Sequence, residues 1–349
     1  MSASDRRSAE GRGDVDRPRQ QMTAILSADH VTRRFSPRIT LGDRIAGLLG
    51  AKVDRRSVHA VTDVSLSVQQ GETLGLVGES GCGKSTLGRM LAGILEPSEG
   101  AVRLHGTAPM RGKHKVTTRI QTVFQDPFAS LNPRQRIGTT ISEGPVAHGL
   151  ISRAEAPAIV ADWLSRVGLD PAYAQRYPHQ FSGGQRQRVA IARALAMQPE
   201  VLVCDEPVAS LDVSIQAQIL NLFLDLRRQL GLTCLFISHD LSVVRHVSDR
   251  VAVMYLGRIV EMGKAARIYS SPRHPYTQGL LDSVPKLQLA GNQAVHFKPI
   301  AGELPSPLSP PSGCAFHPRC PKATRLCREE RPQLMPREEE TFVACHHAP

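Results

Sequence analysis

The segment from Gly78 to Thr86 constrains the fold of this chain more than any other. It reads Gly-Glu-Ser-Gly-Cys-Gly-Lys-Ser-Thr and fits G-x-x-x-x-G-K-S/T, the pattern of a phosphate-binding loop. The apolar run 73–77 precedes it, and apolar residues recur after it at helical spacing from Leu87 to Ile94. A strand, a glycine-rich turn and a helix in this order predict a nucleotide site in an α/β sheet.

Each part of this loop has a chemical reason. Glycines let backbone N–H groups turn towards phosphate oxygens, and the positive end of the following helix attracts the same charge. We expect Lys84 to reach the β- and γ-phosphates of ATP and the Ser85 hydroxyl to bind Mg²⁺. An ordinary glycine-rich turn is the alternative, and the position between a strand and a helix argues against it. The predicted nucleotide contacts are Gly78, Glu79, Ser80, Gly81, Cys82, Gly83, Lys84, Ser85 and Thr86.

Two carboxylates follow a second buried strand. The apolar run 201–204 ends in Asp205 and Glu206. Asp205 is suited to holding Mg²⁺, directly or through water, and Glu206 to polarising an attacking water molecule. A solvated acidic turn is the alternative, which the phosphate loop upstream disfavours. A third strand, 232–237, is followed by His239, and a histidine in that place is by itself more often a capping or surface residue.

The alternation of strands and helices predicts a P-loop α/β core with a mostly parallel sheet. Further strands near 24–31 and 61–68, and a hairpin at 251–262, give it an antiparallel β portion. Between about 126 and 180 the pattern is helical with Pro and Gly breaks, which predicts an inserted helical subdomain. The segment 36–59 interrupts the strands, and helical spacing there predicts a short amphipathic helix with the apolar residues Leu41, Ile45, Leu48 and Leu49.

A second pair of glycines follows Phe181. Ser182 can cap the next helix, and Gly183 and Gly184 leave the N–H groups at that helix end uncovered, before Gln185. Such a helix end binds phosphate, but the chain already has a phosphate site for its own nucleotide. We therefore expect this second site to serve the γ-phosphate of a nucleotide held by another subunit.

The order of these motifs resembles that of the ABC ATPase family over residues 24–264. The resemblance implies that Gln125, in Val-Phe-Gln-Asp, contacts Mg²⁺ and relays the state of the nucleotide to membrane subunits. It also implies that Phe35 stacks on adenine and that Ser210 and Asp212 belong to the D-loop. His239 would be the switch histidine, which acts in catalysis with Glu206.

More specifically, the chain resembles the ATPase subunits of bacterial dipeptide and oligopeptide importers. The resemblance lies in the surroundings of Lys84, Asn132 and Gln185, and in two C-terminal stretches, His274-Pro-Tyr-Thr and Gly302-Glu-Leu-Pro-Ser-Pro. It implies ATP hydrolysis coupled to peptide uptake, a second ATPase subunit, identical or related, two membrane permease subunits and, indirectly, a solute-binding protein. Glutathione and nickel importers share much of this signature and stay open as alternatives, as does an ABC ATPase outside transport.

Charge and composition narrow the partners and the location. The formal net charge is +11, but basic residues are scattered, and only five tyrosines and one tryptophan are present. Single strands of nucleic acid bind to basic stripes with interleaved aromatics, so we expect no nucleic-acid partner. No stretch approaches the roughly 18 apolar residues of a membrane-spanning helix. The polar tail 1–23, expected to be disordered, resembles no secretion signal, which predicts a peripheral protein on the cytoplasmic side of the plasma membrane.

The C-terminal extension, predicted at residues 265–349, contains four cysteines: Cys314, Cys320, Cys327 and Cys345. Four thiolates can close a tetrahedral Zn²⁺ site or hold a 4Fe–4S cluster, and some of the peptide-importer ATPases that the chain resembles carry such a cluster there. Zinc with His317 or His346, and reduced thiols without a ligand, are the alternatives. The Pro-rich stretch 299–313 predicts a linker, and few large apolar residues follow it, so we expect burial alone not to order this tail.

Overall fold

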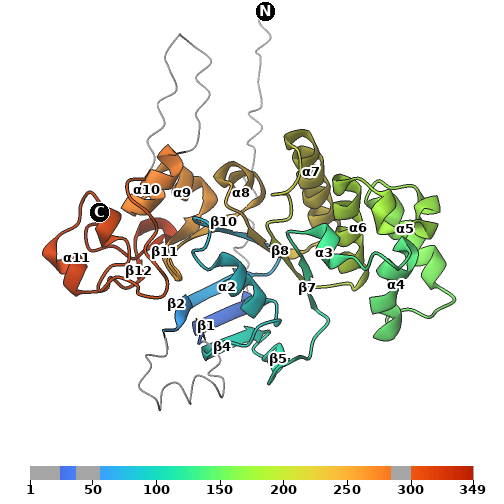
Figure 1. The fold of residues 1–349 in the computed structure, drawn as a ribbon, viewed down its shortest axis with the longest axis horizontal. Coiled ribbons are helices and arrows are strands. Elements are labelled where there is room, and N and C mark those ends of the chain that lie inside the picture. The colour runs from blue at the N-terminus through green and yellow to red at the C-terminus, as the bar shows by residue number, and fades with distance from the viewer. Residues whose placement is uncertain (1–23, 37–55, 284–299, 349) are drawn as a thin grey trace, which may run out of the picture.

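The computed structural model describes residues 24–36, 56–283 and 300–348. Two predictions, the disordered tail 1–23 and the amphipathic helix within the segment 36–59, therefore lie outside the described residues. Figure 1 shows strands at the centre of the molecule, the helices α3 to α6 on one side and the C-terminal elements on the other. The central strands therefore have a helical part of the chain on one side and the C-terminal part on the other.

The larger sheet has eight strands in the order β12-β13-β11-β10-β3-β9-β8-β7. Its parallel part runs from β10 (Arg250–Tyr255) through β3 (Thr73–Val77), β9 (Thr233–Ile237) and β8 (Val201–Asp205) to β7 (Ile120–Val123). Every residue of β3, β8 and β9 is buried, as is typical of parallel strands that are covered on both faces. Ligands bind at the carboxyl ends of such strands, where the predicted loop and the two carboxylates lie.

Helices follow three of the parallel strands, and those after β8 and β9 make the crossovers that parallel strands require. α2 (Lys84–Leu91) follows β3, α7 (Val213–Leu230) follows β8, and α8 (Leu241–Val247) follows β9. α2 contacts β8 and β9, and α8 contacts β3. α7 ends at Gly231, which has a left-handed φ of 61°, the usual way in which glycine stops a helix.

A second sheet supplies the antiparallel portion that the sequence predicts. β1 (Ala24–Phe35) lies between β2 (Val58–Gln69) and β4 (Glu99–Leu104), and both pairings are antiparallel. Apolar residues of this sheet share one buried cluster with α2 and with strands of the larger sheet. A small hairpin, β5 (Met110–Arg111) and β6 (His114–Lys115), follows β4.

Residues 126–180 contain helices and no strand. Their apolar core includes Trp163, Ile137 and Leu164 and continues into the cluster beneath the larger sheet. Within the described residues, no helix combines the length and the apolar character needed to cross a membrane. The helical elements of this side of the molecule are α3 (Pro127–Ser130), α4 (Ile137–Ala147), α5 (Ala156–Arg166), η1 (Pro171–Gln175), η2 (Pro178–Gln180) and α6 (Gly183–Ala196).

The C-terminal elements continue the larger sheet. β11 (Arg258–Lys264) forms the predicted hairpin with β10, and β13 (Phe342–Val343) pairs antiparallel with β11. β12 (Met335–Pro336) pairs with β13. The remaining elements of this region are α9 (Ala265–Ser270), α10 (Pro275–Asp282), η3 (His317–Arg319), α11 (Arg325–Glu329) and η4 (Glu338–Glu340).

The expectation that burial would not order the tail is wrong. Phe316 is 2% exposed, and its ring centroid lies 5.2 Å from that of Tyr255 and 5.4 Å from that of Tyr276. The stretch predicted as a linker also touches the core, because the Pro307 carbonyl accepts the N–H of His59 at 2.9 Å. The prediction weighed only the apolar residues that follow the Pro-rich stretch, whereas Phe316 packs on tyrosines of β10 and α10, which precede it.

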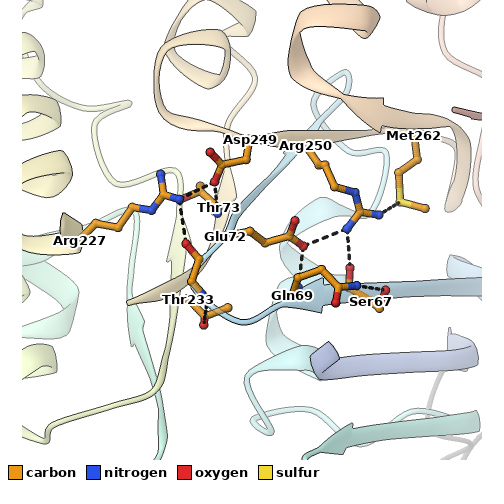
Figure 2. A network of polar contacts seen from close by, with 10 residues as sticks. Ser67, Gln69, Glu72, Thr73, Arg227, Thr233, Asp249, Arg250 and Met262 are labelled. Atoms are coloured by element: carbon orange, nitrogen blue, oxygen red, sulfur yellow. Dashed lines mark hydrogen bonds and ion pairs between the residues drawn. The ribbon is translucent and has the colours of Figure 1, made fainter. Parts of the chain in front are cut away.

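A network of polar contacts fixes the turn between β2 and β3 (Figure 2). Arg250 pairs with Glu72 at 2.9 Å. Burial raises the pKa of Glu72, and Arg250 works against this by stabilising the carboxylate. Arg227 pairs with Asp249, which also accepts the N–H of Thr73 at 2.7 Å. Because β3 leads directly into the phosphate loop, these pairs anchor the strand that carries it.

Candidate nucleotide site

The loop between β3 and α2 has a shape that only glycine permits at two positions. Gly78 has a φ of 154°, and a Cβ there would lie 2.2 Å from the carbonyl oxygen of Met254. Gly83 has a φ of 106°, and a Cβ there would lie 2.1 Å from the carbonyl oxygen of Ala60. Both neighbours are backbone atoms, which cannot turn aside as a flexible side chain can. These glycines therefore let the loop lie directly against β10 and β2.

Two polar residues at the start of α2 face the loop and the neighbouring strand. Lys84 is only 4% exposed, and its ammonium donates to the carbonyl oxygens of Gly78 at 2.8 Å and Glu79 at 3.1 Å. The Ser85 hydroxyl donates to Asp205 Oδ1 at 2.8 Å. The structure thus places two of the three predicted Mg²⁺ ligands in contact, at the ends of different elements.

Burial raises the pKa of Asp205, while the hydrogen bond from Ser85 lowers it. A carboxylate that is short of water in this way gains from a cation beside it. Since carboxylate and hydroxyl oxygens are ligands that Mg²⁺ accepts, Ser85 and Asp205 fit the ion that the sequence predicts here.

Glu206 stands between two other predicted residues. Its Oε2 accepts from Gln125 Nε2 at 3.1 Å and lies 3.2 Å from His239 Nδ1. The Glu206 side chain is 12% exposed, whereas that of His239 is 51% exposed. Gln125 therefore contacts the predicted base rather than Asp205 in this structure. The backbone of Glu206 has a φ of 49°, a left-handed conformation of the kind found at functional turns.

Gln125, Glu206 and the start of α2 line a cavity of about 470 Å³. Phe35, predicted to stack on adenine, is 40% exposed at its wall. Val58, Ala60 and Pro307 were not predicted. Nothing in the sequence marks the first two, while Pro307 ends a stretch quoted above for the family and not for the site. The cavity is lined by Phe35, Val58, Ala60, Ser80, Gly81, Gly83, Lys84, Ser85, Thr86, Gln125, Glu206 and Pro307.

Two of the predicted loop contacts are engaged elsewhere through their side chains. Cys82 is 1% exposed, and burial raises the pKa of its thiol, so it packs beneath the loop as a neutral group. The carboxylate of Glu79 pairs with Arg319 of the C-terminal extension. Any contact of these two residues with phosphate would therefore involve their backbone.

The second glycine motif starts α6 at a distance from this cavity. Ser182 accepts the N–H of Gln185 at 3.4 Å, and the Gln185 side chain accepts the N–H of Ser182 at 3.0 Å. This reciprocal capping box fixes the helix end. A Cβ on Gly184 would lie 2.5 Å from the Ile215 side chain, so the helix end also packs closely on α7. No residue of 182–185 lines the cavity described above.

The predicted D-loop residues lie beside this helix end. Ser210 and Asp212 are exposed, and Asp212 is the residue just before α7. Leu211, between them, comes within 3.5 Å of where a Cβ on Gly183 would stand. The two motifs therefore adjoin each other, with Ser182, Ser210 and Asp212 exposed and residues 183–185 half-buried.

The fold brings the four C-terminal cysteines into electrostatic reach of one another. The pKa of Cys314 is raised to about 11, mainly by burial and in smaller part by the charges of Cys327, Cys345 and Cys320. Nevertheless, among the residues that the structure describes, no group of three or more His, Cys, Asp or Glu side chains is placed to hold a metal ion. The structure therefore does not support the predicted 4Fe–4S cluster.

The two histidines of the zinc alternative contact backbone oxygens. His317 Nδ1 lies 3.0 Å from the Cys314 carbonyl and His346 Nε2 lies 3.0 Å from the Glu330 carbonyl. A ring nitrogen that donates to a carbonyl has no lone pair for a metal, so each histidine would have only its other nitrogen available.

Comparisons with known proteins agree with these observations. The ABC transporter family model matches residues 61–209, and the model for the C-terminal region of oligopeptide/dipeptide transporters matches residues 260–327. The oligopeptide transport ATP-binding protein AppF of Bacillus subtilis (strain 168) is 50% identical over 306 residues, 86% of this chain and 92% of that protein. The di/tripeptide transport ATP-binding protein DppF of Pseudomonas aeruginosa (strain UCBPP-PA14) is 51% identical over 338 residues, 94% of this chain and 98% of that protein.

Solved structures give the same answer for the fold. The ATP-binding cassette MJ0796, in a dimeric post-hydrolysis state bound to ADP and Pi, aligns with a TM-score of 0.57 and 26% identity over 69% of this chain and 98% of that chain. The predicted fold class is confirmed. The chain belongs to the ABC transporter family, as an ATP-hydrolysing subunit of the group that carries the oligopeptide/dipeptide transporter C-terminal region.

Proposed function

We propose that this ATPase drives the uptake of dipeptides or oligopeptides through a membrane permease. The observation that carries the proposal is the set of contacts made by residues that line one cavity: Ser85 with Asp205, Gln125 with Glu206, and Glu206 with His239. Peptide as cargo is supported by relatives of about 50% identity that are named for oligopeptide and di/tripeptide transport. The second candidate is the same motor serving glutathione or nickel import.

In the proposed reaction, Glu206 accepts a proton from the water that attacks the γ-phosphate of ATP. His239, at 3.2 Å from Glu206 Oε2, orients that carboxylate and can carry a proton away. Mg²⁺ held by Ser85 and Asp205 would neutralise charge on the phosphate oxygens. Lys84, now bonded to loop carbonyls, would turn to the β- and γ-phosphates. Gln125 would respond to the state of the nucleotide through its hydrogen bond to Glu206.

We propose that two such subunits, identical or related, sandwich ATP head to tail. The residues 182–185 sit at a partly exposed helix end that does not line the cavity of their own chain. A helix N-terminus with uncovered N–H groups suits a γ-phosphate, and the adjacent Ser210 and Asp212 would face the same partner. The dimeric state named for the cassette MJ0796 supports this arrangement.

We propose that a permease segment docks in a groove of about 360 Å³ between β7 and the helices α4 and α6. Phe124 lines this groove while its neighbour Gln125 lines the nucleotide cavity. Two neighbouring residues thus line the groove and the nucleotide cavity. A change at the nucleotide could therefore reach the permease segment through this short stretch of backbone. Burial lowers the pKa of Lys115 in this groove to about 8, which favours a partner that brings an acidic group.

The permease contact would hold the chain at the cytoplasmic face of the plasma membrane as a peripheral subunit. A solute-binding protein would act on the other side of the membrane and deliver the cargo to the permease pair. Two permease subunits and two ATPase subunits match the proposed sandwich, because each ATPase contributes a copy of this groove. Nucleic acid has no part in this proposal.

For the four C-terminal cysteines, we propose a metal site that needs their side chains to move closer than they lie here. Support comes from the charges of Cys320, Cys327 and Cys345, which all lie near enough to Cys314 to raise its pKa. Anaerobically purified protein should contain roughly four irons and four sulfides per chain if the site holds a 4Fe–4S cluster. One zinc per chain would replace the cluster by a single ion, and titration of free thiols without metal would remove the site.

The transport proposal is tested with the subunit assembled with its permeases and its second ATPase in vesicles. Peptide presented with the solute-binding protein should raise ATP hydrolysis and accumulate inside, and Glu206→Gln should abolish both. The same vesicles receive glutathione or nickel as competing cargo. Stimulation by either of these and not by peptide would overturn the peptide assignment while leaving the motor in place.

A further inference from the structure

The side chain of Glu79, in the phosphate loop, is tied to the C-terminal extension (residues 265–349). Its carboxylate oxygens accept from the two terminal nitrogens of Arg319, at 2.7 and 3.0 Å. The Arg319 side chain is 6% exposed and that of Glu79 is 25% exposed, so the pair is largely shielded from water. A two-pronged contact of this kind is the strong form of an ion pair.

The backbone of Glu79 is held as well. Its N–H donates to the Tyr276 hydroxyl at 2.9 Å, and Tyr276, in α10, is fully buried. Its carbonyl accepts from Lys84 at 3.1 Å. The extension thus holds two groups of a loop residue whose third group binds the lysine expected to meet the phosphates.

Arg319 is itself fixed on the extension side. Its Nε donates to the Ala301 carbonyl at 3.0 Å, and its guanidinium carbon lies 5.9 Å from the ring centroid of Tyr255. Further along the same segment, Pro307 lines the nucleotide cavity and bonds through its carbonyl to His59. The extension therefore reaches the loop at Glu79 and the cavity at Pro307.

Charge gives this contact a consequence for binding. An unpaired carboxylate in the phosphate loop repels the phosphates of ATP, and the repulsion is stronger where little water screens it. Arg319 cancels the charge of Glu79 and its two-pronged geometry holds the side chain in place. A lysine could supply the charge but not the fork.

We propose that Arg319 is a positioning residue for ATP binding, which keeps Glu79 neutralised and, together with Tyr276, holds the phosphate loop in its receptive shape. On this view the C-terminal extension is a working part of the nucleotide site. The proposal rests on the nucleotide role of the loop given above and adds a residue that lies outside the loop.

The test measures equilibrium binding of a fluorescent ATP analogue to the full-length chain, with thermal unfolding recorded for each variant. Arg319→Met, which keeps the apolar stem and removes the cation, should raise the dissociation constant about tenfold, equal to about 1.4 kcal/mol. Adding Glu79→Gln to it should recover most of the affinity, because no bare carboxylate remains. The matched control is Arg325→Met, which removes an 89% exposed arginine of the extension and should bind like wild type.

A purely structural staple predicts a different pattern. In that case Glu79→Gln would not rescue Arg319→Met, and affinity would follow the unfolding temperature. Wild-type affinity in folded Arg319→Met would overturn the proposal. If that variant does not fold, Tyr276→Phe removes only the hydroxyl that accepts the Glu79 N–H, and it should weaken binding about threefold. Unchanged binding by Tyr276→Phe would then count against the proposal.

Lys84→Ala separates this inference from the proposed function. Loss of binding in Lys84→Ala together with wild-type binding in Arg319→Met would leave the nucleotide site standing and remove only the role of Arg319. Normal binding in Lys84→Ala would overturn the nucleotide site itself, and with it the inference.

Discussion

The phosphate loop and the four C-terminal cysteines both have to gather several groups around one ligand, and they do so differently. In the loop the groups are consecutive, and many are backbone N–H groups, so the join between β3 and α2 places them. In the extension they are side chains spread from Cys314 to Cys345, which only packing can bring together. The loop already surrounds a cavity of about 470 Å³, whereas the described cysteines form no group placed to hold a metal. Sites built from local backbone are formed with the fold, and sites built from distant side chains depend on how well their supports pack.

This difference suggests that changes near the loop should alter chemistry first, while changes in the extension should alter stability first. The ion pair between Glu79 and Arg319 is where the two regions meet. The following predictions test how far the separation holds; apart from the control that accompanies the first, they are given in order of decreasing expected effect.

Glu206→Gln should give the largest effect. It keeps the contacts in the cavity but removes the proton acceptor, so ATP hydrolysis should fall about 10²- to 10⁴-fold while ATP binding stays near that of wild type. Single-turnover kinetics measure the rate of hydrolysis, and equilibrium titration measures the affinity for ATP separately. Turnover near wild type would exclude Glu206 as the base.

Glu261→Gln is the matched control for that experiment, at a carboxylate of β11 beside the extension. Glu261 is fully buried, and it accepts the N–H groups of Arg273 and His274 at 2.8 and 3.0 Å. Replacing one of its acceptor oxygens should lower the free energy of unfolding by about 1 to 3 kcal/mol and leave the hydrolysis step of folded protein little changed.

Phe316→Ala should open the extension. Phe316 packs against both Tyr255 and Tyr276, and truncating a buried phenylalanine costs about 3 to 5 kcal/mol. Hydrogen exchange of residues 300–348 should speed up more than that of β3, β8 and β9. If all of these exchange equally fast, the extension and the core unfold as one unit and the separation is wrong.

His274→Asn should change how stability depends on pH. Burial lowers the pKa of His274 to about 4, whereas an exposed histidine titrates near 6.5. Between these two pH values the unfolded chain therefore binds a proton at His274 that the folded chain does not bind. The associated stability is present above about pH 6.5 and is lost as the pH falls towards 4, by up to about 3 kcal/mol.

Asparagine at position 274 can still accept the N–H of Tyr276, as His274 Nδ1 does at 3.0 Å, but it does not titrate. Thermal unfolding between pH 7 and 4 should therefore show a smaller loss of stability in His274→Asn than in wild type. Parallel curves for the two proteins would show that another group governs the acid response.

Cys82→Ala should have the smallest effect, although it changes a residue inside the phosphate loop. The thiol is 1% exposed and sits beneath the loop, so its loss should cost about 1 kcal/mol of unfolding free energy and change ATP affinity less than about twofold. A tenfold loss of affinity would show that the Cys82 side chain shapes the phosphate contacts directly.

Several parts of the fold and the site could be predicted because they depend on short segments. The glycine pattern of the loop, the apolar strand before Asp205 and the cap at Ser182 each involve neighbours in the chain, and the structure has the expected loop, strand and helix start at these places. Gln125 was expected beside Mg²⁺ from the family resemblance, and in the structure it bonds to Glu206 at 3.1 Å. Gln125 could contact either of the adjacent carboxylates, Asp205 or Glu206. The exact positions of the strand ends decide between them, and the sequence does not give those positions.

By itself, the sequence determined the fold class and the order of the nucleotide motifs, because backbone N–H groups and apolar periodicity act over a few residues, and the resemblance of those motifs pointed to the family. Only the tertiary structure decided how the C-terminal extension is ordered and what it touches. Phe316 is buried by Tyr255 and Tyr276, and Arg319 meets Glu79, which lies 240 residues earlier. Contacts between segments so far apart in the sequence depend on the packing of the whole chain, and no local pattern of residues predicts them.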